Sequence, residues 1–157
     1  MKKLFTILTL AASIFAASNV SAASIESNDA NYAASQTIVQ ENPDRALLEM
    51  GVDHLQSMLP MDTGDGITMS EAYLTHSNFV LEFIAPNDVI DLIRLEFKDI
   101  DKVEFLKDIV EADEATKSML QLCVSAECGF TMIYSDSTFM NQLKITFSPE
   151  ELSTILK

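Results

Sequence analysis

The sequence predicts an α+β domain, in which an antiparallel sheet of about four strands, formed by two hairpins, packs against helices. Three observations predict this class. Apolar residues at helical spacing open the main part of the chain, alternating strand-like runs appear twice, and a mostly helical stretch separates them. Because an amphipathic helix and a half-buried sheet each need an apolar partner, the simplest arrangement places the helices on one face of the sheet.

The first helix of this domain begins after Asn42. Asn caps helices well, Pro43 suits the first helical position, and an acidic residue follows at the positive end of the helix. Four apolar residues then recur at helical spacing: Leu48, Val52, Leu55 and Leu59. Pro60 ends the helix. Gly51 weakens it by up to about 1 kcal/mol relative to Ala, so burial of the apolar stripe must stabilise it.

Two strand-like runs follow a turn cluster at residues 62–66. They span residues 67–75 and 79–85, and the short polar segment 76–78 joins them as a hairpin connection. Residues 88–122 are mostly helical in pattern, with a break near Asp113.

The second hairpin opens at Cys128-Gly129. Phe130, Met132 and Tyr134 alternate with smaller residues, and 135–138 form a turn. In the returning strand, one face carries Phe139, Leu143, Ile145 and Phe147. A capping box, Ser148 to Glu151, then opens a short terminal helix.

The N-terminus has the three-part pattern of a secretory signal peptide. Lys2 and Lys3 form a positive region, residues 4–17 are almost wholly apolar, and the small residues around Ala22 suit signal peptidase. The apolar run is shorter than the roughly 20 residues that a membrane span needs. We therefore expect a signal peptide over 1–22, a flexible leader over 23–41 and a single α+β domain over 42–157. The product would be periplasmic or secreted, without membrane insertion after cleavage.

The chain is strongly acidic. It has ten Lys and Arg against 24 Asp and Glu, a net charge of −14, and loss of Lys2 and Lys3 would make it −16. Such a charge repels nucleic-acid phosphates and anionic lipids, so no nucleic acid is expected as a partner. It favours a basic protein partner. Within the acidic stretch 96–114, we predict that Glu104, Asp108 and Glu111 bind this partner. The alternative is an ordinary solvated helix face.

Cys123 and Cys128 are the two cysteines of the chain. Export to an oxidising compartment makes a disulfide between them the expected state. Four intervening residues are too many for the usual redox-active pair, and too few other ligands accompany them for a zinc site.

No catalytic, metal-binding or cofactor-binding motif is present. The chain lacks a G-x-S-x-G elbow, an H-E-x-x-H motif and a Gly-rich phosphate loop. We therefore predict no catalytic residues, no metal and no cofactor, and a non-catalytic exported protein-binding module with an acidic surface. The alternative is a small periplasmic hydrolase whose site forms only in three dimensions, with His54 or His76 as acid or base.

Several segments together resemble a known group of proteins: Leu59-Pro60, Gly66-Ile67-Thr68, Phe79 to Phe83, a helix that ends at Cys123, and the hairpin with Tyr134. Over residues 59–147 the chain is similar to small exported bacterial α+β proteins of unassigned function. The resemblance implies a shared α+β fold and no activity. By analogy, such proteins serve as immunity proteins that block a toxin or as accessory proteins of secretion machines.

Overall fold

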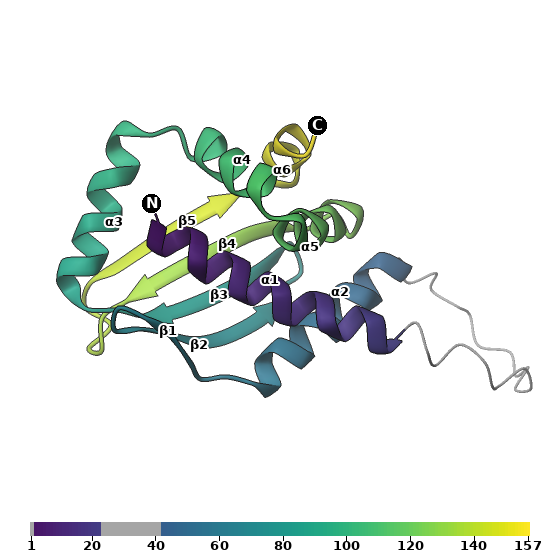
Figure 1. Ribbon diagram of the computed structural model, residues 1–157, viewed down its shortest axis with the longest axis horizontal. Helices are drawn as coiled ribbons and strands as arrows, with labels where there is room; N and C mark the ends of the chain where they lie inside the picture. Colours follow the sequence, from purple (N-terminus) through teal and green to yellow (C-terminus); the bar gives the residue numbers. More distant parts are fainter. Residues whose placement is uncertain (1, 23–41) are drawn as a thin grey trace, which may run out of the picture.

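A computed structural model describes residues 2–22 and 42–157 (Figure 1). The predicted leader, residues 23–41, lies outside the described residues. The elements, in chain order, are α1 (Lys2–Ala22), α2 (Pro43–Ser57), β1 (Met61–Gly64), β2 (Ile67–Leu74), β3 (Asn78–Ile84), α3 (Asn87–Asp99), α4 (Lys102–Ala112), α5 (Glu114–Ser125), β4 (Gly129–Ser135), β5 (Gln142–Phe147) and α6 (Pro149–Ile155).

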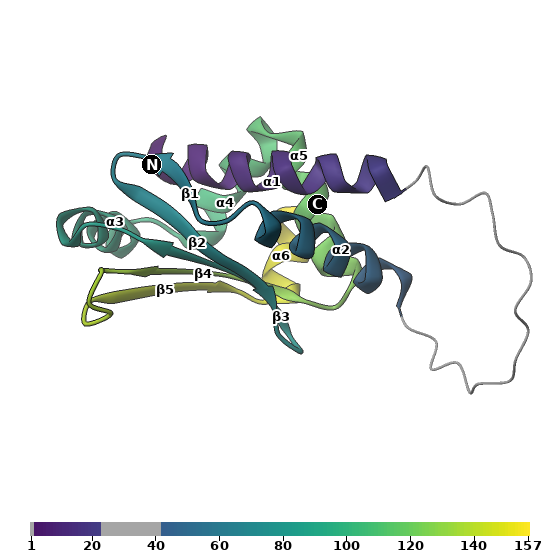
Figure 2. The same cartoon turned by 90° about the horizontal axis from the view of Figure 1, so that it is seen from below.

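The helices and the sheet form two layers. Figure 2 shows α1, α2, α4, α5 and α6 on one face of the sheet, and α3 at one end of it, near β5. This arrangement confirms the α+β class. Within residues 2–22 and 42–157, no helix combines the length and apolarity that a membrane span requires.

The prediction of four antiparallel strands is wrong in two respects. The sheet has five strands in the order β1-β2-β3-β4-β5, and β3 pairs with β4 in parallel, from Asn78 opposite Gly129 to Ile84 opposite Ser135. The reason is the connection between them. Helices α3, α4 and α5 carry the chain back to the end of the sheet where β3 began, and such a crossover makes the next strand parallel.

The additional strand is β1, in the segment predicted to be only a turn. Met61 pairs with Met69 and Asp62 with Thr68, and the chain reverses through Gly64 and Gly66, whose φ angles are 91° and 76°. Such positive φ values suit glycine. The turn prediction was correct at its centre. The strand was missed because four residues with a single large apolar side chain give almost no alternation.

The core lies between the sheet and the helices. On the helix-facing side, Phe79, Leu81 and Phe83 of β3 pair with Phe130, Met132 and Tyr134 of β4. All six are at most 1% exposed. The rings of Phe83 and Tyr134 stack with centroids 4.8 Å apart.

The alternation of apolar residues placed Phe139 in the returning strand, but the structure places it outside β5. It lies in the turn before β5 with a φ of 58° and is 64% exposed. Asp136 shapes this turn, because its carboxylate accepts hydrogen bonds from the Thr138 hydroxyl (2.8 Å) and the Met140 backbone N–H (2.9 Å).

The predicted helix starts are confirmed. The Asn42 side chain accepts a hydrogen bond from the Asp44 N–H at 3.0 Å, and Ser148 and Glu151 form the capping box of α6. The break near Asp113 is also confirmed, because that residue ends α4 and caps α5 through the Thr116 N–H. A further break at Ile100 and Asp101 separates α3 from α4.

Candidate protein-binding groove

Helix α1 is packed into the body of the molecule. It contacts α2, α5 and β1 and lies across the helix layer, as Figures 1 and 2 show. A single stripe of its side chains is buried to 2% exposure or less: Ile7, Leu8, Ala11, Ala12 and Phe15. Their spacing of three, four and one residues is that of one helical face. This stripe covers a surface formed by α2, α5 and β1, which we call the α1 groove.

Phe15 lies between the sheet and α2 in the α1 groove. Its ring centroid lies 6.2 Å from that of Phe79 on the sheet, at an interplanar angle of 37°. A Cβ atom added to Gly51 of α2 would come within 3.0 Å of three carbons of the Phe15 ring. Gly51 therefore forms a notch in α2 that only a residue without a side chain leaves open.

The apolar surface of α2 continues beyond the part that α1 covers. Leu47 lies one turn before Gly51 on the same face of α2, and Met58, the residue that caps the C-terminal end of α2, follows seven residues after Gly51. Leu47 is 37% exposed and Met58 is 48% exposed, and the neighbouring Met50 is 46% exposed. A longer or broader helix than α1 could cover these side chains as well.

One side chain of α1 is poorly matched to the groove. The hydroxyl oxygen of Thr9 is buried and has no hydrogen-bond partner. A buried hydroxyl without a partner destabilises a structure by about 1–3 kcal/mol. An apolar residue at this position would fit the groove better.

The buried stripe gives α1 its affinity for the groove. Burial of Ile7, Leu8 and Phe15 contributes roughly 2 kcal/mol for each side chain before the cost of ordering the helix. Removal of α1 would expose the apolar surface beneath it to water. A contiguous apolar surface of this kind marks an interaction site.

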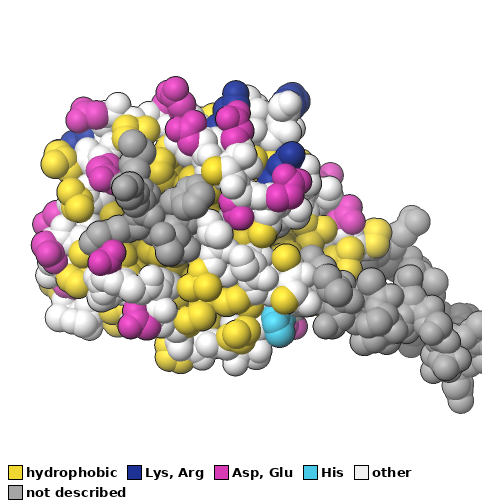
Figure 3. Space-filling view, in the orientation of Figure 1, with side chains coloured by type: hydrophobic (Ala, Val, Ile, Leu, Met, Phe, Trp, Pro, Cys, Tyr) yellow, Lys and Arg dark blue, Asp and Glu magenta, His cyan; other side chains and the backbone are white. Residues whose placement is uncertain are grey.

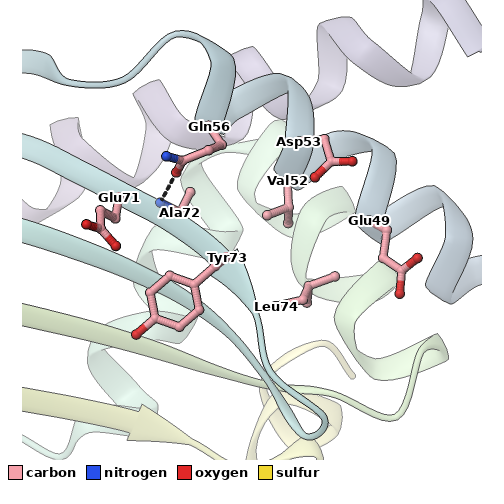
Figure 4. A pocket seen from close by; sticks show the side chains of 8 residues that line it. All are labelled: Glu49, Val52, Asp53, Gln56, Glu71, Ala72, Tyr73 and Leu74. Carbon is pink, nitrogen blue, oxygen red and sulfur yellow. Dashed lines mark hydrogen bonds between the residues drawn. The ribbon is translucent and has the colours of Figure 1, made fainter.

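A second hollow lies on the other side of α2, against strand β2 (Figure 4). Its volume is about 530 Å³, and its lining consists of Glu49, Val52, Asp53, Gln56, Glu71, Ala72, Tyr73 and Leu74. The Gln56 side-chain oxygen accepts a hydrogen bond from the Ala72 N–H at 2.7 Å. Three carboxylates make this hollow acidic, and neither histidine lines it.

One lining residue of this hollow, Tyr73, is hydrogen-bonded to the neighbouring strand β3. Its phenol donates a 2.6 Å hydrogen bond to Glu82. This hydrogen bond, together with burial and the charges of Glu82 and Glu71, raises the pKa of Tyr73 to about 12. The phenol therefore stays protonated at physiological pH and cannot act as a base there.

The two histidines lie on different elements of the described part of the chain. His54 lies on α2 and His76 in the turn between β2 and β3, and both are exposed. Among the described residues, no group of three or more His, Cys, Asp or Glu side chains is arranged to hold a metal ion.

The predicted partner-binding residues share one face of α4. Glu104, Asp108 and Glu111 are all exposed, and Lys107 lies among them. Figure 3 shows acidic side chains gathered along the upper edge of the molecule, with a few basic ones between them. Helix α5 contacts both α4 and α1, so the acidic face lies one helix away from the α1 groove.

The predicted disulfide is absent from the structure, in which Cys123 and Cys128 are both free and fully buried. The Cys128 thiol has other partners. It donates to the Ala126 carbonyl at 3.5 Å and accepts from the Arg45 guanidinium at 3.2 Å. Burial, followed by the neighbouring Cys128, raises the pKa of the Cys123 thiol far above its usual range, so this thiol stays protonated and unreactive.

Comparison with known proteins identifies the fold. No protein-family model matches the chain, and no sequence among the curated proteins matches it. A candidate secreted protein from Pseudomonas aeruginosa, solved by crystallography, is similar with a TM-score of 0.55 and 9% identity, over 74% of this chain and 99% of that one. This match confirms the expected resemblance to small exported bacterial α+β proteins of unassigned function.

Two type II secretion system pilotins also share part of the arrangement. AspS from Vibrio cholerae has a TM-score of 0.45 at 12% identity, and EpsS from Vibrio vulnificus a TM-score of 0.46 at 9% identity. Each match covers 71% of this chain and 94% of the pilotin. At these identities the likeness concerns the fold alone.

Sequence reasoning missed the α1 groove. The apolar run over residues 4–17 was interpreted as an export signal, and nothing in that pattern indicates where such a helix packs. One signal was present in Gly51. A glycine in the middle of an amphipathic helix is unfavourable, and it marks a place where another group approaches the backbone closely.

Proposed function

We propose that this protein is an exported, non-catalytic binding protein that takes an apolar helix of a partner protein into the α1 groove. One observation carries the proposal. In the full-length chain an apolar helix already occupies this groove, with its aromatic ring in the Gly51 notch. A surface that accepts one apolar helix has the shape and chemistry to accept another.

Export would empty the groove. Cleavage after Ala22 removes all of α1, whereas the sheet and the other helices lie within residues 42–157. Among the described residues, all but five of the buried apolar side chains belong to this remaining part, so we expect the core to persist without α1. We call the product, residues 23–157, the exported chain. Its vacant groove would then be available to a partner.

The charged residues around the groove indicate which class of partner would bind there. Glu49 and Asp53 of α2 are exposed on one side, and the acidic face of α4, with Glu104, Asp108 and Glu111, lies beyond α5 on the other. A helix with an apolar stripe and basic flanks complements this surface. An anionic lipid surface would be repelled by the net charge of the exported chain, which is −16 after loss of Lys2 and Lys3. A secretion-accessory protein and an inhibitor-type protein are the two forms this function would take.

The test compares two forms of the protein as ligand receptors. The probe is a fluorescent peptide of residues 4–18 with Gln at Ser13 and Ala17, which are the exposed positions among the described side chains of α1, residues 7–17. We expect saturable binding to the exported chain, purified from periplasm, and binding at least about tenfold weaker to the full-length chain, because α1 competes at a high effective concentration. Fluorescence anisotropy measures both affinities.

Two controls distinguish binding in the groove from nonspecific binding. A scrambled peptide of the same composition should not bind. The exported chain with Phe139→Ser, which removes an exposed aromatic ring in the turn between β4 and β5, should bind the probe unchanged. Equal affinity for the full-length and exported chains, or no binding to the exported chain, would contradict the proposal.

A further inference from the structure

Building on the proposed function, we infer that the partner helix carries an aromatic side chain that inserts into the Gly51 notch, preceded by two adjacent small residues one turn earlier. The small residues correspond to Ala11 and Ala12 of α1, and the aromatic residue to Phe15. The inference thus assigns a recognition pattern to the partner and makes Gly51 the residue that determines specificity.

In the exported chain, a glycine at position 51 is explained only if another group fills the notch. Gly51 lies in the middle of a 15-residue helix, where glycine is among the least favourable residues. In the full-length chain the Phe15 ring explains it, because a Cβ at this position would overlap that ring. After cleavage the same weak point remains in α2. A ligand side chain in the notch accounts for a glycine at this position in the functional form.

The surroundings of the notch favour a flat ring. On the sheet side lies Phe79, whose ring is tilted by 37° to that of Phe15, and on the helix side lies the bare backbone of Gly51. Phe15 is 1% exposed in this slot. Tilted aromatic pairs at such centroid separations attract each other beyond the effect of burial alone.

The small residues explain how the ring reaches so deep. Ala11 and Ala12 are both 0% exposed, so the backbone of α1 itself lies against the groove at this turn. Larger side chains there would lift the helix and withdraw the ring from the notch. Close approach of helices through small residues is a general packing solution. Ile7 and Leu8, one turn further toward the N-terminus, form the opposite end of the stripe.

A double-mutant cycle between groove and peptide tests the inference. The exported chain, with Gly51 or with Gly51→Ala, is titrated with the labelled 4–18 peptide and with its Phe15→Ala form. We expect Gly51→Ala to weaken binding of the Phe15 peptide by at least about tenfold, and to change binding of the Phe15→Ala peptide by less than about twofold. An Ile14→Ala peptide, altered at a half-buried position beside the ring, should lose as much affinity with Gly51→Ala as the parent peptide does.

The outcomes separate this inference from the proposed function. If apolar peptides bind but Gly51→Ala weakens both the Phe15 and the Phe15→Ala peptides equally, the aromatic anchor is wrong and the helix-binding groove stands. If no peptide binds the exported chain, both are wrong. Circular dichroism and urea unfolding check that Gly51→Ala remains folded. Gly51→Ser provides a second substitution, for which the same coupling to Phe15 is expected.

Discussion

Single side chains of α1 show that this helix is an imperfect occupant of its groove. The Thr9 hydroxyl is buried without a partner, although the rest of the stripe is apolar. We predict that Thr9→Val stabilises the full-length chain by about 1 kcal/mol, because it replaces an unpaired hydroxyl with an apolar group of the same shape. Urea unfolding measures the change. Ser13→Ala, at an exposed position of the same helix, should change stability much less, and an effect of equal size would contradict the assignment.

The hydrogen bond from Tyr73 to Glu82 gives a second prediction at this scale. Because the folded-state pKa of Tyr73 is raised to about 12, its contribution to stability is fully present below pH about 10 and is lost as the pH rises toward 12. Glu82→Gln removes the negative charge and should move the Tyr73 pKa back toward 10. Phenolate absorbance during an alkaline titration measures it. An unchanged titration curve would show that Glu82 does not control this phenol.

The two cysteines give a third prediction at the scale of single residues. Both thiols are free and fully buried, so we predict that a thiol reagent finds none in the folded full-length chain and two after denaturation. Finding none after denaturation would mean that the two cysteines form the disulfide that export suggested.

Among the elements, α6 shows how a local sequence signal and a long-range contact combine. Glu151 accepts hydrogen bonds from the Lys102 ammonium on α4 and from the Ser148 N–H of its own capping box. These interactions, the one with Lys102 foremost, hold the pKa of Glu151 below its usual range. The carboxylate therefore attaches the terminal helix to its neighbour and completes its first turn.

We predict that Glu151→Ala destabilises the protein by about 1 kcal/mol at neutral pH, through loss of the capping box. Since the folded-state pKa is lowered, this stabilisation is present above the ordinary Glu pKa and is lost as the pH falls through the lowered value. The difference in melting temperature between wild type and variant should therefore shrink at acidic pH. Glu111→Ala, at an exposed position of α4, should show no comparable effect. A difference that grows on acidification would contradict the assignment.

The sequence predicts elements well where local chemistry determines them. The Asn42 cap, the break at Asp113 and the capping box of α6 all depend on residues within one turn of each other, and all three were found as expected. The parallel pairing of β3 with β4 depends instead on three intervening helices, which no local pattern encodes. Strand β1 was missed because its pairing with β2, and not its own alternation, makes it a strand.

The candidate site was less predictable than the fold. Glu104, Asp108 and Glu111 were chosen from the acidic stretch 96–114, and the structure places them together on the exposed face of α4. The α1 groove required knowledge of which distant helices meet, since Phe15 and Gly51 are 36 positions apart in the sequence. Only the unfavourable position of Gly51 within α2 pointed toward a close contact.

At the scale of the whole molecule, charge and apolar surface have different roles. In the proposed function the groove would supply affinity through burial, whereas the net charge of the exported chain, −16 without Lys2 and Lys3, would act at long range. We predict that the exported chain binds a groove peptide with flanking Lys residues more tightly than one with flanking Gln, by about threefold to tenfold at low salt. The combined variant Glu104→Gln, Asp108→Asn and Glu111→Gln should reduce this preference and its salt dependence. If the preference is unchanged in the variant, the acidic face of α4 does not steer the partner.

The central claim is that the notch at Gly51 is filled in the full-length chain and vacant in the exported chain, ready for a partner helix. The most direct test is the effect of Gly51→Ala on the free energy of unfolding of both forms. We predict opposite signs. The added methyl group should destabilise the full-length chain, because it displaces Phe15, and should stabilise the exported chain by up to about 1 kcal/mol, because alanine favours the helix. A change of the same sign in both forms would contradict the claim.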